Sequence, residues 1–448
     1  MKFNKLYQAC FAVHAGSILF FLLCMVADAK AQGQKMTVET AIELALKNNY
    51  DIVISKNLSV QASNNNTLGN AGMLPQVDLI ASGSLANNAT KQEFANGLIV
   101  DRQGVESRNI ATGAYLTWTV FDGLKMFATH EKLQELERMG ALNAKIQIEN
   151  TLVMVITAYY TITMQKQLII GLKENIEVSE ERLKIAQKKF DTGAISKVDL
   201  LQAKIDLNAL KSSLMRQNTL LSDAKANLNQ LLIQPVEQDI DVSDSIPLMP
   251  QYKYEDLKNT IMANNSDLLF AQKNIEISKY MIKEGKSVAY PRLNLNANYI
   301  FTKSQNQAGF ALFNQNLGLN FGFTASWRIF NGFNTTNNVK NLQLNLQNST
   351  YEFENLKTIT QLNLVKAFKK NQDDIAILKL EEENNLLAKE NLEIALERFR
   401  LGASTSIELK IAQESYEESI QRLSDARFNA KISETRLLKL SGDIIKQG

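Results

Sequence analysis

Four stretches of the chain alternate apolar and polar side chains with a period of two, the pattern of β-strands with two unlike faces. They cover residues 76–87, 112–121, 292–302 and 316–330. In the last stretch the apolar face carries Leu317, Leu319, Phe321, Phe323, Ala325, Trp327 and Ile329. Strands of about 10–15 residues suit a tilted path through a membrane. Trp118 and Trp327 lie near strand ends and are expected to form an interfacial aromatic girdle.

A soluble β-sandwich is the alternative for these strands, but such a fold usually needs about seven or more of them. Four strands cannot close a barrel, and lipid tolerates no open sheet edge. Several chains must therefore share one barrel. Two copies would give about eight strands, a size that side chains fill, whereas three copies would give about twelve and leave a lumen. The strand count favours a trimer.

The rest of the chain predicts helices that are too long for a globule. Residues 124–190 contain no proline and repeat apolar side chains at alternating steps of three and four, which is the coiled-coil period. This helix would span about 100 Å. A return helix at 196–232 and a helix at 254–288 follow, separated by a non-helical equatorial connection at 235–253. Ordinary bundle helices are the alternative interpretation of this periodicity.

The chain is an internal duplication, with 32–234 as the first structural repeat and 254–448 as the second. Asn48-Asn49-Tyr50-Asp51 corresponds to Asn264-Asn265-Ser266-Asp267 at an offset of about 216, counted along the printed sequence. From the two tryptophan segments onward the offset is about 209. The second repeat therefore predicts a long helix and a return helix at 405–440 after its two strands.

Residues 1–31 are expected to be a signal peptide, with a basic start, an apolar run and a small-residue cleavage triplet at Ala29-Lys30-Ala31. A transmembrane anchor is the alternative. Both cysteines, Cys10 and Cys24, lie in this leader. Removing it lowers the net charge of the chain from +2 to about zero, because Lys2, Lys5, Lys30 and Asp28 leave with it.

Composition argues against catalysis, cofactors and metals. His130 is the only histidine after the predicted leader, and histidine supplies most general bases and many zinc ligands. We therefore expect no enzyme, no catalytic residue, no metal site and no cofactor. No basic run suggests a nucleic-acid partner.

Two glycine turns join the long helices to their return helices. Gly193 and Gly402 can end a helix in the left-handed conformation. Ser196 and Thr405 are expected as N-caps of the next helices, each with an acid three residues later to complete a capping box: Asp199 and Glu408.

These features together resemble the TolC family of outer-membrane efflux channels over essentially the whole chain beyond the leader. The resemblance rests on the duplication, the segment 37–46 with Asn48-Asn49, the strand entries Leu74-Pro75 and Tyr290-Pro291, both tryptophan segments and both glycine turns. It implies a mixed α and β membrane protein: a homotrimer in outer-membrane lipid, with a twelve-stranded β-barrel continued by a long periplasmic α-helical barrel.

The resemblance also implies partners and sites. A periplasmic adaptor (membrane fusion) protein, served by an inner-membrane RND or ABC transporter, would dock at the periplasmic tip on Gly193, Ala194, Ser196, Gly402, Ala403 and Thr405. Asp199 and Glu408 match acidic positions near the family's periplasmic constriction. Phe399 and Ser404 stand where the best-known members carry a gate tyrosine and a gate arginine, so the gate's locking network departs from theirs.

The function expected is the exit duct of a tripartite efflux system, which passively conducts small toxic molecules from periplasm to exterior. An exit duct of a type I protein secretion system is the alternative within this architecture. A soluble trimeric coiled-coil scaffold or adhesin is the alternative from another class.

If the two acidic positions line the lumen, Asp199→Asn combined with Glu408→Gln should weaken cation preference, because rings of carboxylates attract cations. Block by divalent cations should weaken as well. Reversal potentials of the channel in planar bilayers measure this, and an unchanged ion selectivity would exclude the role.

Overall fold

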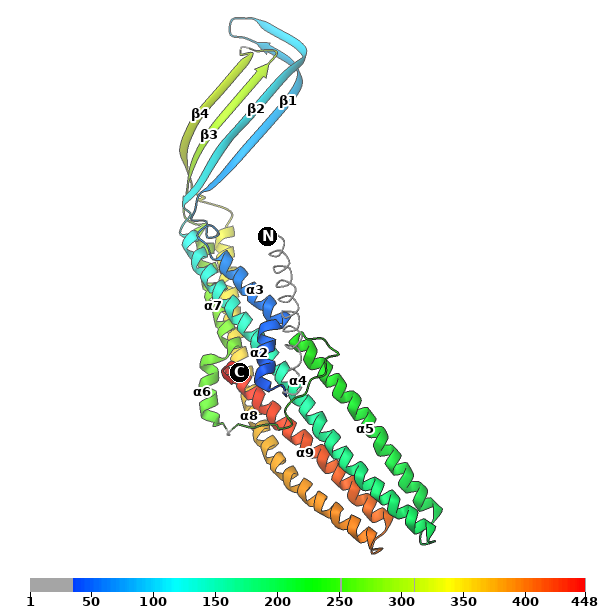
Figure 1. The fold of residues 1–448 in the computed structure, drawn as a ribbon. Helices are drawn as coiled ribbons and strands as arrows, with labels where there is room; N and C mark the ends of the chain where they lie inside the picture. The colour runs from blue at the N-terminus through cyan, green and yellow to red at the C-terminus, as the bar shows by residue number, and fades with distance from the viewer. Residues whose placement is uncertain (1–34, 250–251, 310, 448) are drawn as a thin grey trace, which may run out of the picture.

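The computed structural model describes residues 35–249, 252–309 and 311–447, and the predicted signal peptide lies outside them. The molecule is elongated, with a sheet at one end and long helices at the other (Figure 1). Its elements are α2 (Val38–Asn48), α3 (Tyr50–Asn65), β1 (Gln76–Glu93), β2 (Ile99–Phe121), α4 (Lys125–Asp191), α5 (Lys197–Leu232), α6 (Tyr254–Asn264), α7 (Ser266–Ser287), β3 (Arg292–Asn306), β4 (Phe313–Ser326), α8 (Asn334–Arg400), α9 (Ser406–Ser441) and the short 3₁₀ helix η2 (Ile444–Gln447).

The four strands form one antiparallel sheet in the order β1-β2-β3-β4, so β1 and β4 are its two edges. Three strands are longer than the sequence predicted: β1 runs on to Glu93, β2 already begins at Ile99, and β3 continues to Asn306. Their extra residues carry polar and charged side chains on both faces, which hides the period of two. The prediction of a strand over 316–330 is wrong at its end, because β4 stops at Ser326, which pairs with the first residue of β3.

The single helix predicted at 254–288 is two helices, α6 and α7, because Asn265 interrupts it. The Asn265 side chain accepts a hydrogen bond from the Leu268 amide at 3.0 Å and donates one to the Leu440 carbonyl oxygen at 3.0 Å. Asparagine competes with the helix in this way when its side chain caps the following turn. Asn49 separates α2 from α3 with the same two kinds of bond, so the break is duplicated along with the fold.

The long helices form a wall one helix thick. α4 packs against α5 and α9 in its tip-side part and against α3 and α7 in its sheet-side part, and α8 packs against α9 and α7. α4 and α9 approach closely at Gly171, where an added Cβ would lie 2.6 Å from Ile420. Among the described residues, no helix is both long and apolar enough to cross a membrane.

The main core lies at the middle of the molecule, where α2 and the connection after α5 pack on the wall. The connection is not helical in its described residues. The main core includes Leu152, Val155, Tyr159, Leu228, Leu232 and Val242. The Tyr159 side chain is 1% exposed, and its hydroxyl donates to the Met36 carbonyl oxygen at 2.8 Å and accepts from the Ser243 amide at 3.1 Å. Tyr159 of α4 therefore binds two segments at once: the one before α2, through Met36, and the connection, through Ser243.

Tyr159→Phe should loosen the connection, because the Ser243 amide and the Met36 carbonyl oxygen lose their shared partner inside the core. We expect a local cost of about 1–3 kcal/mol. Hydrogen exchange of peptides covering 36–40 and 241–245 measures it. Tyr160→Phe is the matched control, since Tyr160 is buried as well but its hydroxyl makes no hydrogen bond with any described residue. Equal exchange in both variants would contradict the role of Tyr159.

Candidate functional site

The strand register places most apolar side chains of the four strands on one face of the sheet. Leu79 of β1 pairs with Ala114, which pairs with Tyr299, which pairs with Leu319 of β4. The next row on this face joins Val77, Leu116, Ala297 and Phe321. Leu79 is 83% exposed and Phe321 is 85% exposed. A sheet that turns such side chains outward needs an apolar surrounding.

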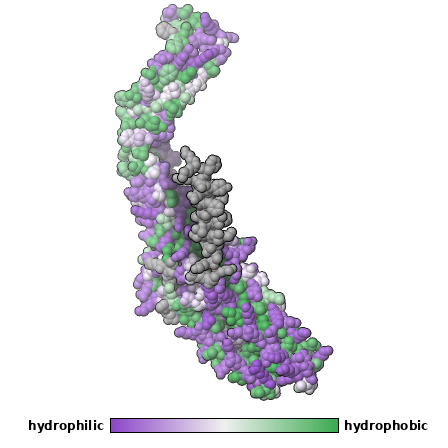
Figure 2. Space-filling view, viewed as in Figure 1, coloured by the Kyte–Doolittle hydropathy of each residue, from purple (hydrophilic) through white to green (hydrophobic). Residues whose placement is uncertain are grey.

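The opposite face of the same sheet is mostly polar. Its row between the two apolar rows consists of Asp78, Tyr115, Asn298 and Asn320. The Asn320 amide donates to the Asn298 side-chain oxygen at 3.0 Å, and Thr119 donates to Asn294 at 3.0 Å. Figure 2 shows hydrophobic residues frequent over the sheet, whereas the helices on the viewed face are largely hydrophilic. The sheet thus has one apolar face and one polar face.

The two predicted interfacial tryptophans lie at the helix-facing end of the sheet and make equivalent bonds. The Trp118 ring nitrogen donates to the Met73 carbonyl oxygen at 3.0 Å, and the Trp327 ring nitrogen donates to the Ala289 carbonyl oxygen at 3.0 Å. Trp327 follows the last residue of β4. Each ring therefore ties a strand end to the chain that enters the sheet, and each keeps an exposed apolar body, as an aromatic girdle requires.

The two glycine turns lie together at the end of the molecule far from the sheet (Figure 1). Gly193 has φ +76° and Gly402 has φ +75°, and a Cβ at either position would meet nothing within 4 Å. Left-handed backbone geometry, not crowding, is therefore the reason for glycine. Each turn is a Schellman motif, in which the amide of Ala194 bonds Lys189 at 2.7 Å and the amide of Ala403 bonds Arg398 at 2.8 Å.

The return helices start with side-chain caps, but the two caps differ. Ser196 and Asp199 form a complete capping box, each accepting from the other's amide at 3.2 Å. Thr405 accepts from the Glu408 amide at 3.2 Å. The capping box predicted for Thr405 and Glu408 is incomplete, because the reciprocal bond from Glu408 is not formed. The Glu408 carboxylate thus stays exposed without the cap role that Asp199 has.

All six positions predicted for docking are exposed on these turns: Gly193, Ala194, Ser196, Gly402, Ala403 and Thr405. Large apolar neighbours that the sequence analysis did not single out surround them. Val198 is 73% exposed, Leu401 82% and Ile407 70%. The tip therefore presents a mixed surface of small and apolar side chains. Apolar residues beside a turn glycine were the signal available in the sequence.

The gate positions divide between surface and core. Asp199 and Glu408 are exposed and Ser404 is half-buried, but Phe399 is only 3% exposed and packs with Leu392, Leu409, Ala412 and Tyr416. Without a hydroxyl, the Phe399 ring packs in the core between α8 and α9. Its place at a gate or lumen stays a prediction. The Lys189 ammonium of α4 covers it at 4.2 Å and donates to the Phe399 carbonyl oxygen at 2.9 Å.

Near the glycine turns, a buried charged network joins two helical hairpins, α4–α5 and α8–α9. The sequence did not predict this network. Arg182 of α4 is 2% exposed. Its guanidinium pairs with Asp206 of α5 at 3.1 Å and donates to the Ser406 hydroxyl of α9 at 2.9 Å. Lys410 of α9 donates to Asp206 at 3.2 Å. A lone arginine in a charged helix gives no sequence signal of burial, because its partners Asp206 and Ser406 lie on other helices, the second of them 224 residues away.

The environment of Asp206 favours its charged form. Burial raises the pKa of the carboxyl, but hydrogen bonds from Gln202 and Lys410 and the charge of Arg182 outweigh burial, so the pKa lies below its ordinary value. Three further contacts cross between the hairpins: Tyr416 donates to Glu174 at 2.6 Å, Lys389 lies 3.7 Å from Glu174, and Arg400 lies 3.5 Å from Glu181. The hairpins are therefore held together electrostatically near the tip.

Among the described residues, no three His, Cys, Asp or Glu side chains cluster in a way that could hold a metal ion.

Comparisons with known proteins agree with this geometry. The family model described as outer membrane efflux protein matches residues 41–232 and 257–443, one match in each repeat. A search among curated proteins returns no match.

The fold is similar to three solved outer-membrane proteins. The CmeC outer membrane channel of Campylobacter jejuni is 17% identical, with a TM-score of 0.76 over 91% of this chain and 86% of that one. The outer membrane protein VceC of Vibrio cholerae is 14% identical, with a TM-score of 0.74 over 90% and 96%. The open-state MtrE channel of Neisseria gonorrhoeae is 14% identical, with a TM-score of 0.71 over 91% and 89%.

Asp206→Asn should loosen the hairpins, because it leaves the buried Arg182 charge without its counter-charge, a change that costs about 3–5 kcal/mol where such pairs are dry. In the native chain the stabilisation is present above the unfolded pKa of about 3.9 and is lost as the pH falls below it, because the folded pKa is lower. The variant should lose this acid dependence.

Spin labels at Val198 and Ile407 report the separation of α5 and α9, and no native cysteine competes once the predicted leader is gone. The distance distribution should broaden in Asp206→Asn at neutral pH and in the native chain only in acid. Asp223→Asn, an exposed position on the same helix, is the control. Equal distributions for all three proteins at every pH would refute the network's role.

Proposed function

The chain belongs to the outer membrane efflux protein family, and from that premise we propose that three copies form one closed exit duct across the outer membrane. Each copy contributes four strands to a barrel and its helical wall to a periplasmic tunnel. Small toxic molecules pass through this duct passively when a periplasmic adaptor and an inner-membrane pump, of the RND or ABC type, deliver them. The chain itself has no catalytic role.

The open sheet is the observation that carries the proposal. β1 and β4 have a partner on one side only, and their free backbone groups would face hydrocarbon. The outward face is apolar and the other is polar, as a barrel around water requires. Joining β4 of one copy to β1 of the next removes every edge. Three copies give about twelve strands, which is wide enough for a lumen.

The helical wall has an unpaired seam as well. Leu380, Leu387 and Ile394 follow one another at heptad spacing along α8, and each is more than half exposed. Ile205 and Met215 are similarly exposed on α5, at the opposite margin of the wall. Packing α8 of one copy against α5 of the next would cover both margins and continue the ring begun by the strands.

The exposed tip supports docking of an adaptor. Small residues of both turns allow close backbone approach, and Val198, Leu401 and Ile407 offer apolar contacts around them. Asp199 and Glu408 then lie on the same end, where threefold repetition would make acidic rings. The family's outer-membrane location excludes the soluble scaffold or adhesin. The alternative within this architecture is a duct whose cargo is secreted polypeptides.

A charge placed on the lipid face should block assembly. Phe321→Arg should cost about 2–4 kcal/mol near the bilayer midplane, since lipid cannot solvate the guanidinium. Asn320→Arg is the matched control: it adds the same charge one residue away on the polar face. Heat-modifiable migration on gels measures the trimer fraction after membrane insertion. Equal trimer fractions for the two variants would contradict the assignment of faces.

Conductance of the purified, detergent-solubilised protein in planar bilayers tests the duct itself. We expect a trimer with stable conductance. A protein that inserts as a trimer and never conducts would refute the proposal.

A further inference from the structure

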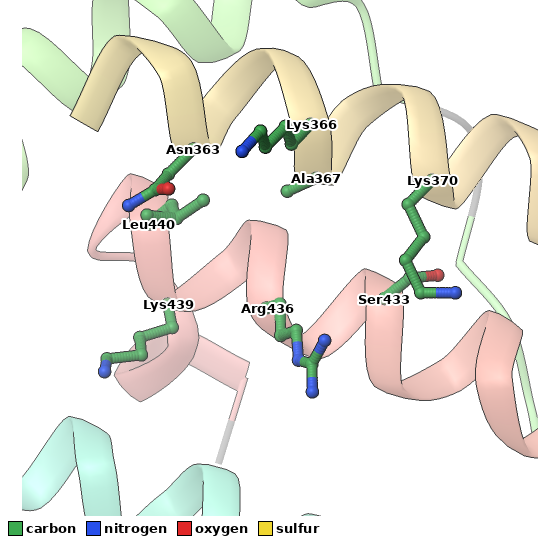
Figure 3. A pocket seen from close by; sticks show the side chains of 8 residues that line it. All are labelled: Asn363, Lys366, Ala367, Lys370, Ser433, Arg436, Lys439 and Leu440. Atoms are coloured by element: carbon green, nitrogen blue, oxygen red, sulfur yellow. The ribbon is translucent and has the colours of Figure 1, made fainter. Parts of the chain in front are cut away.

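We infer that the duct binds anionic groups in a basic groove between α8 and α9, at the height of α6. The groove has a volume of about 320 Å³. Its polar lining comes from six side chains of the two helices: Asn363, Lys366, Lys370, Ser433, Arg436 and Lys439. Figure 3 shows the α8 side chains along one wall of the groove and the α9 side chains along the other. The lining contains four cations and no carboxylate.

Three of these four cations have no counter-ion. Lys370 is neutralised by Asp374, whose carboxylate lies 3.0 Å away and is nearly buried. Lys366, Arg436 and Lys439 form no ion pair anywhere in the described part of the chain. Arg436 is also the one exposed residue between Ala430 and Leu438, in a stretch of α9 that is otherwise buried. The groove therefore carries an uncompensated positive charge.

The face of the wall on which the groove lies decides what can reach it. α6 covers the other face, where Leu257 and Ile261 pack on Leu364 and Leu437. At about 100° per residue, Lys366 lies about 200° around α8 from Leu364. By the same spacing Lys439 lies about 200° around α9 from Leu437. Both ammonium groups thus project from the face of the wall that α6 does not cover.

In a closed ring this face lines the lumen. α2 and the connection after α5 join α6 on the covered face, since Tyr252 of the connection packs against the core clusters of both. Three copies of these elements directed inward would fill the tunnel. The groove also lies between two helices of one chain, away from the exposed α8 seam that a second copy would cover. Threefold repetition then makes a basic ring. This step rests on the duct proposed above, because only the ring creates a lumen.

The chemistry of the groove suits phosphate or carboxylate groups. Guanidinium and ammonium groups bind both through charge-assisted hydrogen bonds. Asn363 adds an amide that has no hydrogen bond to any other described residue. Ser433 also lines the groove, and its hydroxyl already forms hydrogen bonds with the Asn371 amide and the Ala430 carbonyl oxygen. A ligand bearing several negative charges would bridge both walls.

Block of the reconstituted channel by inorganic pyrophosphate tests the inference. Pyrophosphate should reduce the wild-type conductance. The triple variant Lys366→Gln, Arg436→Gln, Lys439→Gln should need about tenfold more of it for half block, the order expected when several exposed charge contacts are lost together. Its reversal potential should also move toward cation preference. Arg436→Lys keeps the charge and should keep most of the block.

The matched control removes three charges at the same height on the covered face: Lys47→Gln, Lys253→Gln, Lys258→Gln. It should leave the block unchanged. Citrate in place of pyrophosphate distinguishes carboxylate from phosphate ligands. Block by either compound supports the groove, and the stronger blocker identifies the preferred group.

Two results would overturn the inference while leaving the duct intact. In one, the wild-type channel conducts but pyrophosphate blocks it no better than it blocks the triple variant. In the other, the control loses as much block as the triple variant, which would assign the effect to the general field of the protein. Absence of any conductance would instead reject the duct and the groove's role together.

Discussion

The backbone of a β-sheet needs hydrogen-bond partners at its edges, and this requirement governs the rest of the molecule. β1 and β4 each leave one edge open, beside a face of apolar side chains. Water could satisfy those backbone groups but would not solvate the apolar face, and lipid could do only the reverse. A closed ring of several copies satisfies both. The helical wall repeats the requirement, because its α8 seam is apolar and uncovered within one chain.

Duplication explains how a single chain builds such a wall. Asn49 and Asn265 break their helices with the same pair of hydrogen bonds, and Trp118 and Trp327 tie the strand ends to equivalent carbonyl oxygens. The halves differ where they meet each other. The network of Arg182, Asp206 and Lys410 occurs only once and has no equivalent at the corresponding positions of the other repeat, because it joins the first hairpin to the second. Repetition thus sets the architecture, and the departures from it set the contacts between halves.

Much of the fold was predictable because it rests on local periodicity. The period of two located all four strands, and the long uninterrupted helices followed from heptad spacing and the absence of proline. The errors have local causes. Polar residues on both faces hid the outer ends of β1 and β2, and the helix break at Asn265 depends on a bond to Leu440 that no local pattern reveals. The site was less predictable: the turns were located, but the burial of Phe399 and Arg182 depends on partners in other helices.

In the proposed duct, acidic positions lie at the periplasmic end and basic ones at mid-height, and sheet edges that no single chain can close hold the copies in a ring. Closure of these edges should require three copies. Electron microscopy of the detergent-solubilised protein tests it most directly. A threefold particle with a continuous wall of strands, in which β4 of each copy pairs with β1 of the next, is the result expected. A stable monomer, or a ring in which those edges stay unpaired, would contradict it.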